Sequence, residues 1–111
     1  MRLKKVVKTR HKGTNRRSKG TNFWNDEYRE GGGHLALSVN VSEDLEAFTR
    51  WLIRTGGKRQ LNVTCSVLDL GCGNGRNLIY LAENYGMHGV GYDISREATL
   101  QAKKLSEGYQ L

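Results

Sequence analysis

A turn rich in glycine near the middle of the chain has the residue types and spacing of a ligand site. The stretch VLDLGCGNGRN, residues 67–77, is a short apolar run followed by a turn that contains Gly71, Gly73 and Gly75. Glycines remove the side chains that would keep a ligand away from the backbone. If this turn joins a strand to a helix, backbone N–H groups and the positive helix end face that ligand. The pattern predicts a site for a nucleoside or a molecule that carries phosphate.

An acidic residue further along the chain extends this expected site. Asp93 ends the short apolar run HGVGYD, residues 88–93. Ligands of open parallel sheets bind outside the carboxyl ends of the strands, so the Asp93 carboxylate should emerge beside the glycine turn. There it could accept hydrogen bonds from two ribose hydroxyls, and we therefore expect a nucleoside ligand.

The glycine spacing bears on which nucleoside binds. The dinucleotide fingerprint is G-x-G-x-x-G, and its third glycine allows the helix to pack closely on the strand. Here the pattern is G-x-G-x-G, and Arg76 stands where that third glycine would be. Arg76 is too bulky for this role, which disfavours an NAD-type Rossmann enzyme and leaves it as an alternative.

The elements that position these residues alternate along the chain. The run CSVLDL, residues 65–70, is short and apolar on both faces, as expected for a strand between two helical layers. A helix over 77–86, a strand over 88–93 and a helix over 96–108, capped by Ser95, should follow. This alternation predicts right-handed crossovers and a parallel sheet, the arrangement of an α/β fold.

A helical lead-in is expected before this unit. Ser42 has the features of a helix N-cap, because Glu43 and Asp44 place acid in the first turn. Further upstream, Trp24 and Tyr28 belong to a short element that ends in glycines. These two aromatic side chains either pack in the core or form a lid over the ligand.

The positive charge is concentrated at the N-terminus. Residues 1–20 hold nine of the 18 Lys and Arg residues and none of the 11 acidic ones. Such a segment buries too little apolar surface to become ordered, so we expect a basic flexible arm over 1–22. The arm either contacts the phosphates of RNA or DNA or is an inert, solvated extension. The helical lead-in then covers residues 23–62, and the nucleoside-binding unit covers 63–111.

Composition argues against membrane and metal classes. No apolar run approaches the roughly 18 to 20 residues that span a bilayer, and we expect a cytoplasmic protein. Cys65 and Cys72 do not have zinc-ligand spacing, and His11, His34 and His88 are scattered. We therefore expect reduced thiols and no metal site.

The glycine turn and the strand that ends at Asp93 together resemble the sequence signatures of a known family. VLDLGCGNG is similar to the first signature of class I S-adenosylmethionine-dependent methyltransferases, and GVGYDIS is similar to their second signature. The resemblance covers residues 66–108 and extends more loosely over 23–54. It implies a Rossmann-like fold, of which the chain carries the first β-α-β-α units. It also implies S-adenosyl-L-methionine as cofactor and methyl transfer as the activity.

The resemblance implies roles for individual residues. The glycine turn would face the methionine part of the cofactor, and Asp69 would order the turn or help to hold the amino group. Asp93 would bind the ribose hydroxyls, and Ile94 would pack on the adenine. The cofactor-binding residues expected in this way are Asp69, Gly71, Cys72, Gly73, Asn74, Gly75, Asp93 and Ile94.

Family members choose the methyl acceptor with residues that usually follow the fourth strand, and this chain carries the pattern of two strands. We therefore expect an N-terminal piece of a longer enzyme, inactive alone, with catalytic residues beyond Leu111. The acceptor, a small molecule or RNA, is not identified. Both strands would then show an unpaired apolar edge. The alternative is a small basic protein that binds nucleic acid or another partner through a degenerate half-domain.

Overall fold

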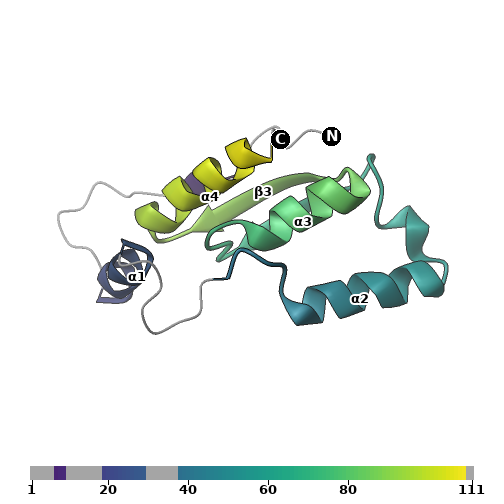
Figure 1. Cartoon of the computed structure of the whole chain (residues 1–111), viewed down its shortest axis with the longest axis horizontal. Helices are drawn as coiled ribbons and strands as arrows, with labels where there is room; N and C mark the ends of the chain where they lie inside the picture. The colour runs from purple at the N-terminus through teal and green to yellow at the C-terminus, as the bar shows by residue number, and fades with distance from the viewer. Residues whose placement is uncertain (1–6, 10–18, 30–37, 110–111) are drawn as a thin grey trace.

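The structure, a computed structural model, describes residues 7–9, 19–29 and 38–109. Its elements, in chain order, are β1 (Val7–Thr9), α1 (Lys19–Arg29), α2 (Glu43–Arg54), the short 3-10 helix η1 (Gly57–Arg59), β2 (Ser66–Leu70), α3 (Arg76–Tyr85), β3 (His88–Asp93) and α4 (Arg96–Gly108) (Figure 1). The alternation of strand and helix from β2 to α4 confirms the predicted α/β class. It is part of a Rossmann-like fold.

The sheet has three parallel strands among the described residues, in the order β1-β3-β2. Strand β2 pairs with β3 so that Leu68 lies opposite Val90 and Leu70 opposite Tyr92. This register brings the carboxyl ends of both strands to the same edge of the sheet. The glycine turn and Asp93 therefore lie close together, as the sequence predicted.

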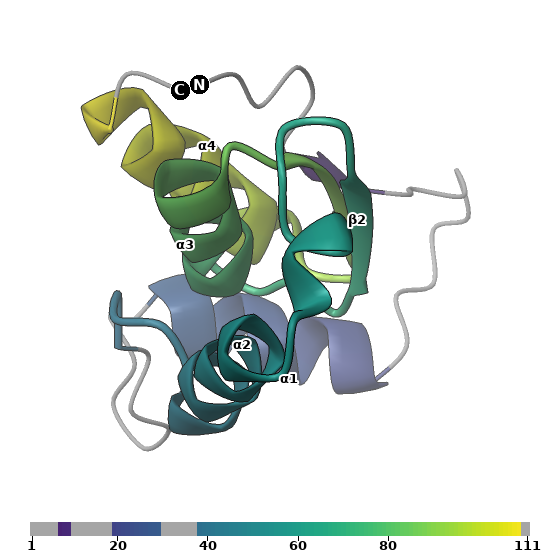
Figure 2. The ribbon, with the colours of Figure 1, turned by 90° about the vertical axis from the view of Figure 1, so that its right-hand side faces the viewer.

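Helices α3 and α4 lie together on one side of β2 (Figure 2). Between these helices and the sheet, Cys72, Leu78 and Ala102 form the buried cluster, and Val67 packs against it. The predicted caps are present. The backbone of Gly86 ends α3 in the left-handed conformation at a φ of 68°.

The opposite face of β2 is exposed. The side chains of Leu68 and Leu70 are 59% and 75% exposed, whereas those of Val67 and Asp69 are half-buried. Successive residues of a strand face opposite sides of a sheet, and helices α3 and α4 both lie on one side (Figure 2). The prediction that this strand is buried on both faces is therefore wrong for the part of the chain that the structure describes.

The N-terminal region contains two elements that its charge did not predict. Strand β1 pairs in parallel with β3, with Thr9 opposite Asp93, so the β3 edge that we expected to be open is occupied. Helix α1 begins at Lys19, inside the segment expected to be a flexible arm. Composition indicates how readily side chains are solvated. Strand β1 is instead held by backbone pairing to the edge of β3, and composition does not predict such pairing. The other residues before 19 lie outside the described part, so their flexibility stays a prediction.

Helix α2 begins where the Ser42 cap predicted. The Ser42 hydroxyl accepts a hydrogen bond from the Leu45 N–H at 3.4 Å, and Gly56 follows the helix with a φ of 85°. Thr49 is buried and its hydroxyl lies 2.8 Å from the Tyr80 hydroxyl of α3. None of the described helices is long and apolar enough to cross a membrane.

Candidate functional site

Two adjoining hollows lie at the carboxyl ends of β2 and β3. The larger is a cavity of about 750 Å³ lined by Trp24, Tyr28, Leu70, Gly71, Tyr92, Asp93 and Ile94. The smaller, of about 160 Å³, is lined by Tyr28, Ser38, Asp69, residues 71–74 and residues 76–77. Because Tyr28 and Gly71 border both hollows, one elongated ligand could occupy the two.

Gly71 keeps the space between the hollows open. Its backbone has a φ of 77°, a left-handed conformation that side chains disfavour, and a Cβ built there would meet nothing within 4 Å. The glycine is therefore required by the turn and leaves room for a ligand to approach the backbone. By contrast, a Cβ on Gly73 would clash with the Tyr28 hydroxyl.

Three backbone N–H groups of the glycine turn are already paired with β3. Those of Gly71 and Cys72 both donate to the Tyr92 carbonyl, at 2.7 and 3.0 Å. That of Gly73 donates to the Asp93 Oδ2 atom at 2.9 Å. Turns that bind phosphate leave such groups pointing at the ligand. These three groups are instead used to hold the turn against β3.

Two carboxylates give this region its electrostatic character. Asp93 accepts from Gly73 through Oδ2 and from the Ser95 N–H through Oδ1, the latter at 2.8 Å. Asp69 is half-buried beside it, and burial first, then the negative charge of Asp93, raises the pKa of the Asp69 carboxyl. Burial and the Asp93 charge also raise the pKa of the Tyr28 phenol, which stays neutral. A cationic ligand would relieve the repulsion between the two carboxylates.

A comparison with protein families identifies the segment that carries this site. Residues 67–111 match the family model described as "Methyltransferase domain". This segment is similar to members of the methyltransferase domain family. The match contains the glycine turn and Asp93, and it confirms the resemblance that the two motifs predicted. No curated protein and no solved structure matches the chain.

The two hollows bring together most of the residues predicted to bind cofactor. Asp93 and Ile94 border the larger hollow, and Gly71 borders both. The residues that border the smaller hollow are Asp69, Cys72, Gly73 and Asn74. Their contacts with a cofactor stay predictions. In the described residues, no group of three or more His, Cys, Asp and Glu could hold a metal ion.

Gly75 and Cys72 serve the packing between the glycine turn and α4. A Cβ on Gly75 would lie 3.1 Å from the Cβ of Ala102, so this glycine allows α4 to approach the turn. The Cys72 side chain lies in the core cluster and is 6% exposed. Burial, followed by the charges of Asp93 and Asp69, raises the pKa of the Cys72 thiol to about 12. Cys72 is therefore a protonated core residue, and only its backbone can serve the turn.

Asn74 holds the glycine turn to the segment that precedes α2. Its Nδ2 group donates to the Ser38 carbonyl at 3.1 Å, and its Oδ1 atom accepts from the Arg76 N–H at 3.2 Å. Arg76 and Asn77 add two further links, because Arg76 donates to the Asn40 carbonyl at 3.3 Å and Asn77 accepts from the backbone of α2's N-cap. These contacts hold the segment from 38 to 42 against the turn, and Ser38 of this segment borders the smaller hollow.

Several lining residues were outside the predicted set. Leu70 and Tyr92 occupy the last positions of their strands that face away from the helices, and the carboxyl-end rule could have found them. Ser38 carries no local signal. The sequence left open whether Trp24 and Tyr28 pack in the core or form a lid over the ligand. In the structure both line the larger hollow, and Tyr28 is also buried, with 7% of its surface exposed.

Proposed function

We propose that the chain supplies the cofactor-binding half of an S-adenosylmethionine-dependent methyltransferase whose acceptor is unidentified. One observation carries this proposal: the glycine turn uses the N–H groups of residues 71–73 internally and lies beside two carboxylates, Asp69 and Asp93. Such a site favours a cation over an anion. The proposed cofactor carries a sulfonium and an ammonium group, whereas a dinucleotide carries a pyrophosphate. The same observation therefore disfavours the NAD-type alternative.

The residues that line the two hollows fit this cofactor. Trp24, Tyr92 and Ile94 give the larger hollow aromatic and apolar walls suited to an adenine ring. Each Asp93 carboxylate oxygen accepts one hydrogen bond from the protein and has a further lone pair for a ribose hydroxyl. In the smaller hollow, Asp69 would hold the ammonium group, with Arg76 near enough to pair with the carboxylate.

When bound, the cofactor would supply a methyl group on a positively charged sulfur, which is already a strong electrophile. The residues of this chain would contribute by binding, orienting and excluding water. Asp93 would fix the ribose and the glycine turn together, and Tyr28 would shield the passage at Gly71 from solvent. Holding donor and acceptor in contact and aligned accounts for much of the rate in such reactions. No general base is assigned to the described residues.

The alternative of a small basic protein that binds nucleic acid rests on the charge of residues 1–20. In the structure, the part of this segment that forms β1 lies beside β3, with Thr9 opposite Asp93. Contact of the basic residues with RNA would be compatible with either function. It would make RNA an acceptor candidate only if the chain also binds the cofactor.

Calorimetric titration of the full chain with S-adenosylmethionine, adenosine and NAD would test the proposal. The Asp69→Asn variant should bind S-adenosylmethionine about tenfold more weakly, because one charged hydrogen bond to the ammonium group is lost. Adenosine lacks that group, so its affinity should not change. Glu83→Gln, which removes an exposed carboxylate from α3, is the control for net charge. Tighter binding of NAD than of S-adenosylmethionine would contradict the proposal.

A further inference from the structure

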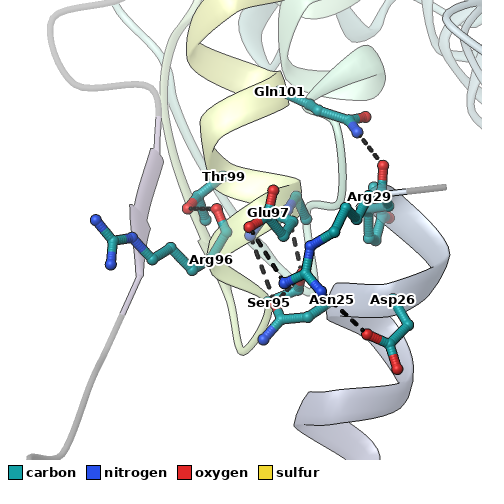
Figure 3. Close-up of polar contacts among 10 residues, drawn as sticks. Asn25, Asp26, Arg29, Ser95, Arg96, Glu97, Thr99 and Gln101 are labelled. Atoms are coloured by element: carbon teal, nitrogen blue, oxygen red, sulfur yellow. Dashed lines mark hydrogen bonds and ion pairs between the residues drawn. The ribbon is translucent and has the colours of Figure 1, made fainter. Parts of the chain in front are cut away.

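Helix α1 presents different residues to the ligand cavity and to helix α4. Trp24 and Tyr28, one turn apart, line the larger hollow. Asn25 and Arg29, also one turn apart, face the N-terminal part of α4 (Figure 3). Whatever fixes α1 on α4 therefore also fixes the two aromatic walls of the cavity.

Asn25 is the buried centre of this contact. Its side chain is 2% exposed, and its Oδ1 atom accepts from the Ser95 hydroxyl at 2.7 Å and from the Glu97 N–H at 3.5 Å (Figure 3). The neighbouring contacts are weaker or more exposed. Gln101 donates to the Tyr28 carbonyl, and Arg29 pairs with Glu97 at 3.5 Å.

Asn25 acts in this contact as a hydrogen-bond acceptor for α4. The Glu97 N–H can only donate, so the amide oxygen must face it, and the Nδ2 group is left buried without a partner among the described residues. A buried donor without a partner costs stability. An apolar residue at this position would avoid that cost, but it would leave the fully buried Ser95 hydroxyl without its acceptor.

A chain of hydrogen bonds leads from Asn25 to the glycine turn. The Ser95 hydroxyl donates to Asn25 and accepts from the Ala98 N–H as the cap of α4. The Ser95 N–H donates to Asp93, and Asp93 accepts from the Gly73 N–H. About one turn beyond Asn25 in α1, the Tyr28 hydroxyl lies against Gly73. The acid expected to bind ribose is thus linked to α1.

We propose that Asn25 is a positioning residue of the cofactor site: through Ser95 it holds α1 on α4, so that Trp24 and Tyr28 close the cavity beside Asp93. This inference rests on the proposed function, because the cavity must receive the nucleoside part of the cofactor. Loosening α1 would open one wall of the cavity and speed release of the ligand. The core between α3, α4 and the sheet would remain.

The test uses the full chain with Trp51→Phe, which leaves Trp24 as the only tryptophan. Acrylamide quenching of Trp24 reports how α1 is docked, and stopped-flow binding of S-adenosylhomocysteine reports affinity and dissociation rate. Asn25→Ala should increase quenching and raise the Kd about tenfold, mainly through faster dissociation. Asn25→Asp keeps an acceptor for Ser95 and Glu97 and should restore both quantities. Asn22→Ala, which removes an exposed amide side chain from the same helix, is the matched control and should change neither.

The outcomes separate this inference from the proposed function. If the parent chain does not bind S-adenosylhomocysteine, the proposed function fails, and unchanged quenching in Asn25→Ala would independently show that Asn25 does not hold α1. If the parent binds and Asn25→Ala binds equally well, the inference alone is overturned. If Asn25→Ala does not fold, Gln101→Ala removes a second α1 contact without touching the cap of α4. It should shift quenching and Kd in the same direction, and no shift would overturn the inference.

Discussion

At the scale of single residues, Asp69 illustrates how a binding group can oppose stability. Burial and the charge of Asp93 raise the pKa of Asp69 above its ordinary value of 3.8, so the folded chain binds this proton more tightly than the unfolded chain does. The free energy of unfolding therefore falls as pH rises from below 3.8 through the folded-state pKa. Above that pKa the ionised Asp69 carboxylate lowers the free energy of unfolding by its full amount.

Removing this charge should stabilise the chain. We expect Asp69→Asn to raise the Tm at pH 7 by about 2 to 4 °C, a modest gain because the side chain is only half-buried. The gain should disappear at a pH below the ordinary value, where the carboxyl is protonated in both states. Thermal unfolding followed by circular dichroism, from about pH 3 to about pH 8, measures the difference in Tm between the variant and the parent. A variant that is less stable than the parent at pH 7 would show that Asp69 has a stabilising partner.

Gly73 and Tyr28 provide a second prediction at this scale. A Cβ on Gly73 would clash with the Tyr28 hydroxyl, and the backbone φ is 57°. Gly73→Ala should therefore destabilise the chain by about 2 kcal/mol through strain and contact together. Combining it with Tyr28→Phe removes the clashing hydroxyl and should recover about 1 kcal/mol, which a double-mutant cycle in urea detects.

Gly71→Ala is the matched control for this cycle. Its φ of 77° gives similar backbone strain, but the added Cβ would meet nothing within 4 Å. Tyr28→Phe should therefore bring no recovery there. Equal coupling at both glycines would mean that the hydroxyl is not the cause. The sequence showed that glycine is needed at Gly71, Gly73 and Gly75, but it did not show that only Gly71 leaves open space.

At the scale of elements, the two helix caps differ in what they hold. The Ser42 hydroxyl caps α2 at 3.4 Å and is half-buried, whereas the fully buried Ser95 hydroxyl caps α4 at 3.1 Å and also donates to Asn25. Replacing a cap by alanine removes one acceptor for a backbone N–H. At Ser95 the same change also leaves a buried partner without its donor.

The Ser→Ala variants should therefore differ in cost. We expect about 1 kcal/mol for Ser42→Ala and about 2 to 3 kcal/mol for Ser95→Ala. Urea unfolding of the two variants gives the comparison directly, and Asn25→Ala in the Ser95→Ala chain should then add little. Equal costs for the two caps would show that the bond between Ser95 and Asn25 does not contribute to stability.

Sequence patterns were reliable for elements whose signals are local. The caps at Ser42 and Ser95, the glycine at 86 and the alternation of strand and helix each report on a few neighbouring residues. The predictions failed where distant contacts decide. The exposed face that carries Leu68 and Leu70 depends on which side both helices take, and no residue of β2 encodes that. The docking of α1 depends on Asn25 and Ser95, which are 70 positions apart.

At the scale of the whole molecule, the N-terminal region combines charge and structure. Its high positive charge predicted a solvated arm, but residues 7–9 form the outer strand of the sheet beside β3. This pairing brings the segment within one strand of Asp93, since Thr9 lies opposite that residue. The charge and the strand can therefore be tested separately.

Two variants of the N-terminal region separate strand pairing from charge. Deleting residues 1–9 removes β1 and exposes the edge of β3, so the amide hydrogens of residues 88–93 should exchange about tenfold faster. Replacing Arg2, Lys4 and Lys5 by glutamine lowers the charge and keeps residues 7–9, so exchange in β3 should not change. Hydrogen exchange followed by mass spectrometry measures both. If the deletion leaves exchange in β3 unchanged, the pairing with β1 contributes nothing in solution. If the glutamine variant weakens salt-dependent binding of single-stranded RNA while exchange in β3 stays unchanged, the charge serves nucleic-acid contact independently of the strand.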